Sequence, residues 1–485
     1  MWLTLQPFIL SVVGLPATVY VIRCLGPEGF GQWSTATALV GALAVITSFG
    51  FRPLFTRDVA QRPESARNEV RYQLGLRTAL GLVAFAAATV ATVALGYPRV
   101  VLLCTLITGA AAIATGAGGA LEDLLQGFQE LRQVALVALA AGLTLTALSA
   151  LVAFLGGGPV SIAIAYAVGP AVSVVLLVWY VRTRHFPVVP AIDLHRFSSL
   201  LRGSRILGAG FLIASVRDRA EGLLVPKLLG ITTFGHFAGG LLLADRLAVI
   251  PSNLTTAFFP LIAQRYHVSE ASAAIEIRRL LVLGQVVCVP MCLLATFHAA
   301  WIAGILFRSP SALAGMVISL TIWALPLQAF ALAFAGTLQA TGSHDAAGRA
   351  NLLTSLVSLP VSVCLVASLG VLGASISWVV RAAIAGALNL PPFLRRFSSA
   401  FSAFPAGAIL LGAAVMAAVE LLAAQFLASQ FMRALVGGGL GAVSYLAVLL
   451  SLRVIRPSDL RRLRAAGNDN AAKPEEAAHA TSDPA

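Results

Sequence analysis

The stretch LGPEGFGQW, at Leu25–Trp33, recurs in weaker form as LGITTFGHF at Leu229–Phe237, 204 positions further along the chain. Two more echoes follow in the same order: LFTRDVAQR at 54–62 matches AFFPLIAQR at 257–265, and LLQG at 124–127 matches TLQA at 337–340. Self-similarity in the same order and at a nearly constant spacing, here about 203 to 213 positions, indicates a repeated structural unit. The sequence therefore predicts two copies of one unit, joined head to tail.

The composition places these units in a membrane. Apolar residues make up 58% of the 485 residues and charged residues only 11%, which is far outside the usage of soluble proteins. Apolar segments of about 20 residues, long enough to cross a bilayer, recur along the chain. We predict fourteen spans, with twelve as the alternative: 2–22, 33–51, 74–95, 100–120, 134–155, 160–181, 206–229, 236–262, 280–299, 313–338, 350–369, 371–391, 404–424 and 434–453.

The basic residues predict the orientation, because Lys and Arg accumulate in cytoplasmic loops. The even-numbered connections and the C-terminal tail hold 24 of the 33 basic residues, six of them between Arg52 and Arg77, and the opposite connections hold five. Both termini are therefore expected in the cytoplasm. The net charge of +13 follows from this distribution and requires no nucleic-acid partner.

Six crossings return a chain to the same side of the membrane, so the two copies predict parallel lobes in an all-α polytopic protein. The expected organisation is an N-lobe at 1–183, a cytoplasmic linker at 184–205, a C-lobe at 206–396, spans thirteen and fourteen in 397–456, and a disordered cytoplasmic tail at 457–485. Parallel repeats suit alternating access, in which two lobes rock about a site near the membrane midplane.

The opening hairpin RCLGPEGFGQWSTATALV, its counterpart LLGITTFGHFAGG and the pair Phe259-Pro260 resemble the polysaccharide transporter and O-antigen flippase branch of the multidrug/oligosaccharidyl-lipid/polysaccharide exporter superfamily. The resemblance covers about residues 2–455. It implies a flippase, not an enzyme, that moves undecaprenyl-diphosphate-linked oligosaccharide across a bacterial inner membrane for lipopolysaccharide or other surface polysaccharide. The implied partners are membrane lipids and polysaccharide polymerase machinery, with no cofactor.

A diphosphate crossing a membrane needs cations in place of water, and guanidinium groups fit phosphate oxygens in bidentate fashion. An arginine at bilayer depth is costly and rarely accidental. We predict a substrate-binding cavity that contains Arg217 in span seven, Arg246 in span eight, Arg381 in span twelve and Arg52 at the cytoplasmic mouth. The alternative for Arg52 is an interaction with lipid headgroups.

Four further residues are predicted to couple to an ion or to pair inside the cavity: Asp218, Arg219, Glu221 and Asp245. On a continuous helix Arg217 and Glu221, four positions apart, can pair directly. If the acids pair with Arg217 and Arg219, then Arg246, Arg381 and Arg52 carry the remaining positive field. The alternative is that the span-seven group neutralises itself and only locks the helix to its neighbours.

A cation-coupled multidrug exporter of the same superfamily is the alternative function. Such an exporter needs carboxylates in a cavity, often in the first lobe, and spans one to six are predicted to hold none at depth. Neither a HExxH motif nor a Walker A sequence is present, so the sequence offers no metal or nucleotide site. The short predicted extracytoplasmic loops disfavour a glycan polymerase.

The predicted topology is testable by cysteine labelling in a variant that lacks the native cysteines. Cysteines introduced near Glu28, Gly157 and Gly235 should react with an impermeant maleimide in intact cells, because these positions lie outside. Cysteines near Ser65 and Arg396 should react only after the cells are opened. Labelling of the second pair in intact cells would overturn both the orientation and the lobe assignment.

Overall fold

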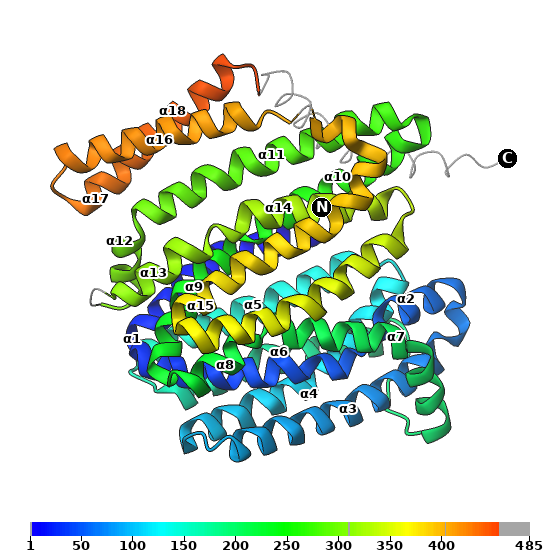
Figure 1. Ribbon diagram of the computed structural model, residues 1–485. Coiled ribbons are helices and arrows are strands. Elements are labelled where there is room, and N and C mark those ends of the chain that lie inside the picture. Colours follow the sequence, from blue (N-terminus) through cyan, green and yellow to red (C-terminus); the bar gives the residue numbers. More distant parts are fainter. Residues whose placement is uncertain (1, 309–310, 403, 455–485) are drawn as a thin grey trace.

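The computed structural model describes residues 2–308, 311–402 and 404–454, and within these ranges the chain is helical with no strand (Figure 1). The predicted disordered tail at 457–485 lies outside the described residues. By length and composition, 11 helical segments can cross a membrane, or 12 if a bent pair in the seventh helix is one span. The all-α polytopic class is confirmed, and the count of fourteen spans stays a prediction.

The N-terminal half forms one group of helices. Its elements are α1 (Trp2–Ser48), α2 (Phe51–Gln61), the short 3-10 helix Pro63–Ser65, α3 (Ala66–Ala94), α4 (Arg99–Gly127), α5 (Leu131–Phe154) and α6 (Pro159–Arg184). Pro159 opens α6 at a position where a missing backbone N–H costs nothing. Residues 185–193 then lead to the second group.

The second group repeats the pattern with more breaks. Its elements are α7 (Leu194–Asp218), α8 (Ala220–Leu228), α9 (Ile231–Leu247), α10 (Val249–Val268), α11 (Glu270–Phe297), α12 (Ala299–Leu306), α13 (Ala312–Thr321), α14 (Ala324–Ala340) and α15 (His344–Ser402). A final hairpin follows, made of α16 (Ala406–Phe426), α17 (Gln430–Met432), the π-helix Arg433–Gly437 and α18 (Gly438–Ser451).

The two longest helices, α1 and α15, each fold back at a glycine. The 59 residues of α15 would span about 90 Å if straight, roughly three times a hydrocarbon core. Gly370 instead adopts a φ of 61°, and a Cβ on Gly373 would overlap the carbonyl oxygen of Leu365, which a straight helix would place about 12 Å away. Gly26, with a φ of 66°, interrupts α1 in the same way. Each helix is therefore a hairpin.

The repeated loops meet in space. The first glycine of each copy, Gly26 or Gly230, has a positive φ, of 66° and 94°, and a helix restarts at the next residue. A Cβ on Gly31 would overlap the carbonyl oxygen of Ile231, and a Cβ on Gly235 would overlap that of Pro27. Since these partners are themselves equivalent positions of the repeat, the contact is reciprocal. We call it the glycine crossing, and it joins α1 to α9.

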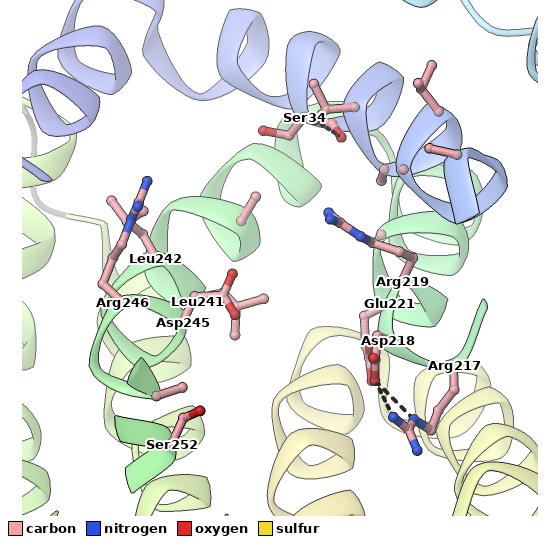
Figure 2. A pocket seen from close by; sticks show the side chains of 18 of the residues that line it. Ser34, Arg217, Asp218, Arg219, Glu221, Leu241, Leu242, Asp245, Arg246 and Ser252 are labelled. Atoms are coloured by element: carbon pink, nitrogen blue, oxygen red, sulfur yellow. Dashed lines mark hydrogen bonds and ion pairs between the residues drawn. The ribbon is translucent and has the colours of Figure 1, made fainter. Parts of the chain in front are cut away.

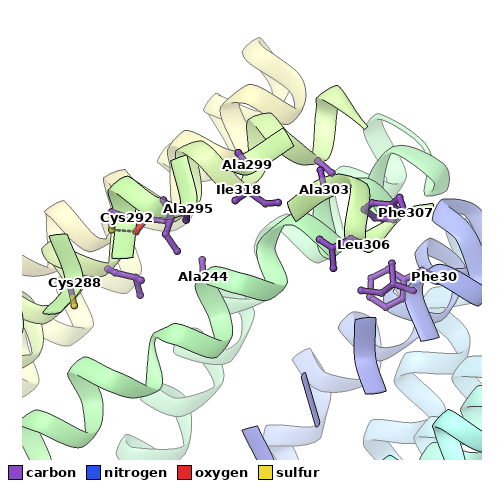
Figure 3. Close-up of a cluster of buried hydrophobic side chains, with 14 of the residues drawn as sticks. Phe30, Ala244, Cys288, Cys292, Ala295, Ala299, Ala303, Leu306, Phe307 and Ile318 are labelled. Atoms are coloured by element: carbon purple, nitrogen blue, oxygen red, sulfur yellow. Dashed lines mark hydrogen bonds between the residues drawn. The ribbon is translucent and has the colours of Figure 1, made fainter. Parts of the chain in front are cut away.

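An apolar cluster supports the crossing from the side of the second group (Figure 3). Ile22 and Phe30 of α1 pack with Leu306 and Phe307 next to α12, and the cluster continues through α9, α11, α13 and α14. At the end of the predicted ninth span, residues Ala299–Leu306 form the separate helix α12, which places Leu306 and Phe307 beside the first hairpin.

The last hairpin packs on α11, apart from α1 to α6 (Figure 1). Met416 and Tyr445 from this hairpin meet Val282 and Val286 of α11 in an apolar cluster. The glycines at 437, 438 and 441 leave space beside the carboxylate of Glu420, which is buried. This hairpin therefore stands beside the two groups and does not enter the space between them.

The glycine crossing predicts a specific sensitivity to one methyl group. Gly31→Ala should lower the melting temperature, because overpacking typically costs about 1–3 kcal/mol. Gly304→Ala is the control: its Cβ would meet nothing within 4 Å, so the better helix propensity of Ala should leave stability equal or slightly higher. Melting followed by size-exclusion chromatography of the full chain in detergent measures both. Equal melting temperatures for the two variants would show that the crossing is loose. A cysteine at Gly235 itself would overlap the Pro27 carbonyl, so the labelling test for this loop uses the exposed neighbour Thr232.

Candidate substrate cavity

A cavity of about 1410 Å³ lies between the two groups of helices. Side chains from α1 to α6 line one side, and side chains from α7 to α10, α14 and α15 line the other. Near the glycine crossing the lining includes aromatic residues from both copies of the repeat, Phe30 and Trp33 from the first and Phe234 and Phe237 from the second. The lining continues to Arg52, Gln339 and Asn389 close to the opposite helix ends. Its volume exceeds the 300–1,000 Å³ or so of ordinary small-molecule sites.

The charged residues of the lining comprise six arginines and five carboxylic acids, so the formal charge is +1. They are Arg52, Arg77, Arg217, Arg219, Arg246 and Arg381, with Glu122, Asp123, Asp218, Glu221 and Asp245. All eight site residues predicted from the sequence line this cavity, and Arg77, Glu122 and Asp123 join them. Whether these residues bind a substrate stays a prediction.

Helix α7 ends at Asp218 and α8 begins at Ala220, so the predicted continuous span is broken at Arg219. The expected pair between Arg217 and Glu221 does not form, because the break removes the four-residue spacing of a regular helix. Arg217 Nη2 lies 2.9 Å from Asp218 Oδ1 instead, and Arg217 Nη1 donates to the hydroxyl of Ser355 at 2.8 Å. Asp218 thus compensates the charge of Arg217 (Figure 2).

Glu221 pairs with Arg381, a partner 160 positions away in the sequence. Arg381 Nη1 lies 3.6 Å from Glu221 Oε2, and the Ser377 hydroxyl donates to Glu221 Oε1 at 2.6 Å. Arg381 also donates to the carbonyl oxygen of Arg217 at the helix break, at 3.2 Å. The Arg381 guanidinium carbon lies 4.3 Å from the ring centroid of Trp378. Arg381 was predicted to carry uncompensated charge if the acids paired with Arg217 and Arg219; this condition is not met, because Glu221 pairs with Arg381 itself.

Arg219 and Arg246 are different, because neither has an ion pair or hydrogen bond with any residue that the structure describes. The guanidinium of Arg219 lies over Gly41 of α1, 3.2 to 3.4 Å from the place that a Cβ would occupy. Figure 2 shows Arg219 extending toward α1, with Arg246 on the α9 side and Asp245 pointing into the space between. Asp245 is close enough to interact electrostatically with both arginines, so together they form a charged gap in which two guanidinium groups share one carboxylate and form no ion pair with it.

The N-lobe side holds a second charged group, which the sequence analysis missed. Asp123 Oδ2 accepts from Arg77 Nη2 at 2.6 Å, and Asp123 Oδ1 lies 3.4 Å from Arg52 Nε. Arg77 and Asp123 are buried, whereas the side chain of Arg52 is 60% exposed. Arg77 also reaches the amide oxygen of Gln73, one turn earlier on α3. Asp123 therefore holds Arg52 at the edge of the cavity.

Two sequence predictions need correction here. The N-lobe spans do contain carboxylates, because α4 continues through Glu122 and Asp123 to Gly127 and does not end at residue 120. Arg77 is not a loop residue, since α3 begins at Ala66 and buries it. The pair of acids in ALEDLLQG, at the end of an apolar run, was the signal that could have indicated this group.

The last hairpin holds one further charged residue that the sequence analysis missed. Glu420 Oε2 lies 3.3 Å from Nε2 of His298, the residue between α11 and α12. This pair lies outside the cavity lining, so it belongs to the attachment of α16 to α11. Among the described residues, no group of three or more His, Cys, Asp or Glu side chains is arranged to hold a metal ion.

Comparison with known proteins decides the family. The model of the family "Polysaccharide biosynthesis protein" matches residues 1–266, more than half of the chain. The chain belongs to this family. The resemblance drawn from the repeated hairpins is thereby confirmed at family level. No curated protein matches the chain significantly.

Solved structures show the same fold at low sequence identity. The lipid II flippase MurJ, in an inward closed conformation, matches with a TM-score of 0.71 at 12% identity, covering 93% of this chain and 99% of that one. An inward-facing multidrug resistance MATE family transporter of the MOP superfamily matches with a TM-score of 0.58 at 14% identity, covering 82% and 99%. A MOP superfamily transporter from Pyrococcus furiosus, described as having a binding pocket of reverse polarity, matches with a TM-score of 0.52 at 16% identity, covering 82% and 94%. At these identities the matches establish the fold alone.

The two charged groups predict unequal costs for removing a carboxylate. Asp123→Ala should destabilise the protein by about 3–5 kcal/mol, because it leaves the buried guanidinium of Arg77 without its anion. Asp58→Ala is the matched control, since Asp58 and Arg57 pair at 3.0 Å with both side chains more than half exposed, and such pairs contribute about 1 kcal/mol or less. Thermal unfolding in nanodiscs measures the difference. A similar small shift in both variants would mean that Arg77 is solvated.

Proposed function

We propose that the chain is a flippase that moves a lipid-linked oligosaccharide, joined to its lipid by a diphosphate, across the bacterial inner membrane for O-antigen or a similar surface polysaccharide. The observation that supports this best is that Arg219 and Arg246, on the wall of a cavity large enough for a glycan, share the single carboxylate of Asp245 and form no ion pair or hydrogen bond with a described residue. The proposed orientation keeps both termini in the cytoplasm. In this proposal the lipid tail stays in the bilayer while the polar head enters the cavity.

A diphosphate favours this site for electrostatic reasons. An arginine beside a low-dielectric wall is stabilised by any anion that replaces its water, and phosphate oxygens accept two parallel hydrogen bonds from a guanidinium. Arg219 and Arg246 can donate such bonds without giving up a protein partner. Arg52, Arg217 and Arg381 remain in the proposed binding set, but a phosphate must compete there with Asp123, Asp218 and Glu221.

The cation-coupled multidrug exporter remains the second candidate because of one specific observation. Glu122 lines the cavity without an ion pair among the described residues, and Asp245 points into the same space from the other side. These two carboxylates could bind a cation between the lobes, which removes the earlier objection that the first lobe lacks acids. The net charge of +1 of the lining favours the anionic substrate.

The flippase proposal predicts a loss of transport from Arg219→Gln and from Arg246→Gln. Each should lower surface polysaccharide by about tenfold or more with normal protein in the membrane, because a hydrogen bond to a charged group contributes about 1.5–3 kcal/mol. Arg62→Gln, which removes an exposed arginine at the end of α2, should have no effect.

Arg381→Ala should reduce the protein level as well as transport, since it leaves Glu221 buried without its ion-pair partner.

The measurement is surface polysaccharide per unit of membrane protein in a strain that depends on this chain. Normal polysaccharide in both the Arg219 and Arg246 variants would contradict the flippase. If, in addition, Glu122→Gln abolished tolerance to cationic drugs, the exporter would replace it.

A further inference from the structure

The N-lobe wall of the cavity carries a belt of hydroxyl groups that the charged site does not use. We call it the hydroxyl belt, and its members are Thr18, Ser34, Thr37, Thr108, Thr146 and Ser149. They come from both halves of α1, from α4 and from α5. Each lies about 8–15 Å along its helix from the end nearest the glycine crossing. Four separate helical segments thus present hydroxyls at one depth.

The hydrogen bonds inside the belt fix its chemical character. Thr18 donates to the carbonyl of Gly14, Thr108 to that of Cys104 and Thr146 to that of Gly142, at 2.7 to 2.8 Å. Thr37 donates to the carbonyl of Ser34 at 3.0 Å. A hydroxyl that donates its hydrogen to a carbonyl of its own helix can only accept hydrogen bonds from a ligand. The belt therefore presents mostly hydrogen-bond acceptors.

An acceptor surface discriminates between the two polar parts of a lipid-linked oligosaccharide. Phosphate oxygens are acceptors themselves, so these threonines offer them nothing, whereas the arginines opposite are donors only. Sugar hydroxyls can donate to the threonines. The cavity lining beside the belt also includes the small apolar residue Ala112, one turn from Thr108 on α4, which leaves room for the C–H face of a sugar ring.

Aromatic side chains border the belt on the side of the glycine crossing. Trp33 and Tyr166 both line the cavity, with ring centroids 6.0 Å apart at an interplanar angle of 72°. The indole Nε1 of Trp33 is buried and has no hydrogen-bond partner among the described residues. A buried donor left unpaired costs about 1–3 kcal/mol, so a ligand oxygen at this place is favoured. A ligand oxygen that reached this indole would supply the missing acceptor.

We infer that the hydroxyl belt, with Trp33 and Tyr166, is a carbohydrate subsite that receives the sugar next to the diphosphate. The inference rests on the proposed function and adds the placement of the sugar. Arg246 lies about 22 Å from the crossing end of α9, deeper along the helix than the belt. The sugar therefore lies between the diphosphate and the glycine crossing and enters the cavity ahead of the phosphates.

The test measures binding of two probes to the full chain in nanodiscs: farnesyl diphosphate, and farnesyl diphosphate bearing one N-acetylglucosamine. Thr146→Val keeps the side-chain shape and removes the acceptor. It should weaken binding of the sugar-bearing probe about 2- to 12-fold, the range for one hydrogen bond, and leave farnesyl diphosphate unchanged. Trp33→Phe should show the same selectivity.

Thr144→Val is the matched control. Thr144 lies two residues away on α5, makes the same 2.8 Å bond to the carbonyl four residues earlier, and does not line the cavity. It should bind both probes like the wild type. Equal affinities of Thr146→Val and Thr144→Val for the sugar-bearing probe, or an equal loss with both probes in Thr146→Val, would overturn the subsite.

Arg219→Gln separates this inference from the proposed function. It should weaken both probes, because both carry the diphosphate. If it weakens both while Thr146→Val weakens neither, the diphosphate site stands and the sugar subsite is wrong. If the wild type binds neither probe, the proposed function fails and the subsite with it.

Discussion

A guanidinium on a low-dielectric wall is costly without an anion beside it, and this constraint organises most of the interior of the protein. Arg77, Arg217 and Arg381 each have a carboxylate within 4 Å, and hydrogen bonds from neighbouring polar groups hold several of these ions in place. Burying such charges is costly unless the geometry is good, so each pair restricts the helices that carry it. The paired charges thus form a frame around the cavity.

Within this frame, Arg219 and Arg246 stand out because neither forms an ion pair or hydrogen bond with a described residue, and the one carboxylate that acts on both is that of Asp245. Arg219 occupies the break between α7 and α8, where its side chain can leave the helix surface and cross to Gly41. Any residue larger than glycine at position 41 would meet the guanidinium at 3.2 to 3.4 Å. The absence of a side chain at Gly41 in one lobe therefore leaves room for the guanidinium of Arg219 from the other lobe. A site whose guanidinium groups have no ion-pair partner and line a cavity suits an anionic ligand.

The sequence predicted the architecture because its signals are local. The length of an apolar segment indicates a membrane span, and the repeat at Leu25–Trp33 and Leu229–Phe237 indicates the parallel halves that meet at the glycine crossing. The pairing of charged residues in the cavity was harder to predict. Nothing in SVRDRAEG, which lacks proline, indicates that the helix breaks at Arg219, and this break decides the partners of Arg217 and Glu221.

The remaining errors come from pairing over long distances. Glu221 pairs with Arg381, 160 positions away, and Asp123 pairs with Arg77, 46 positions away. No periodicity within one helix reveals such contacts. Residues predicted to line the cavity were nevertheless placed there, because a charge inside an apolar span has few other places to go. The sequence therefore indicated which residues matter more reliably than it indicated how they pair.

The distribution of these pairs between the lobes bears on how the protein moves. Every ion pair between cavity-lining residues joins two residues of the same lobe: Arg52 and Arg77 with Asp123, Arg217 with Asp218, and Arg381 with Glu221. The contacts between lobes are of other kinds, such as the glycine crossing and the bond from Lys227 Nζ to the carbonyl of Leu95 at 2.7 Å.

A rocking motion of one lobe against the other can therefore leave every one of these cavity ion pairs intact. It avoids the large cost of separating buried charges, and the barrier comes from apolar and backbone contacts that repack cheaply. Arg219 is the cavity arginine seen to reach across to the other lobe, so its surroundings change most when the lobes part. An anion bound there in one state would lose part of its site in the other. In the proposed mechanism, the residue that attracts the anion is thus also placed to release it.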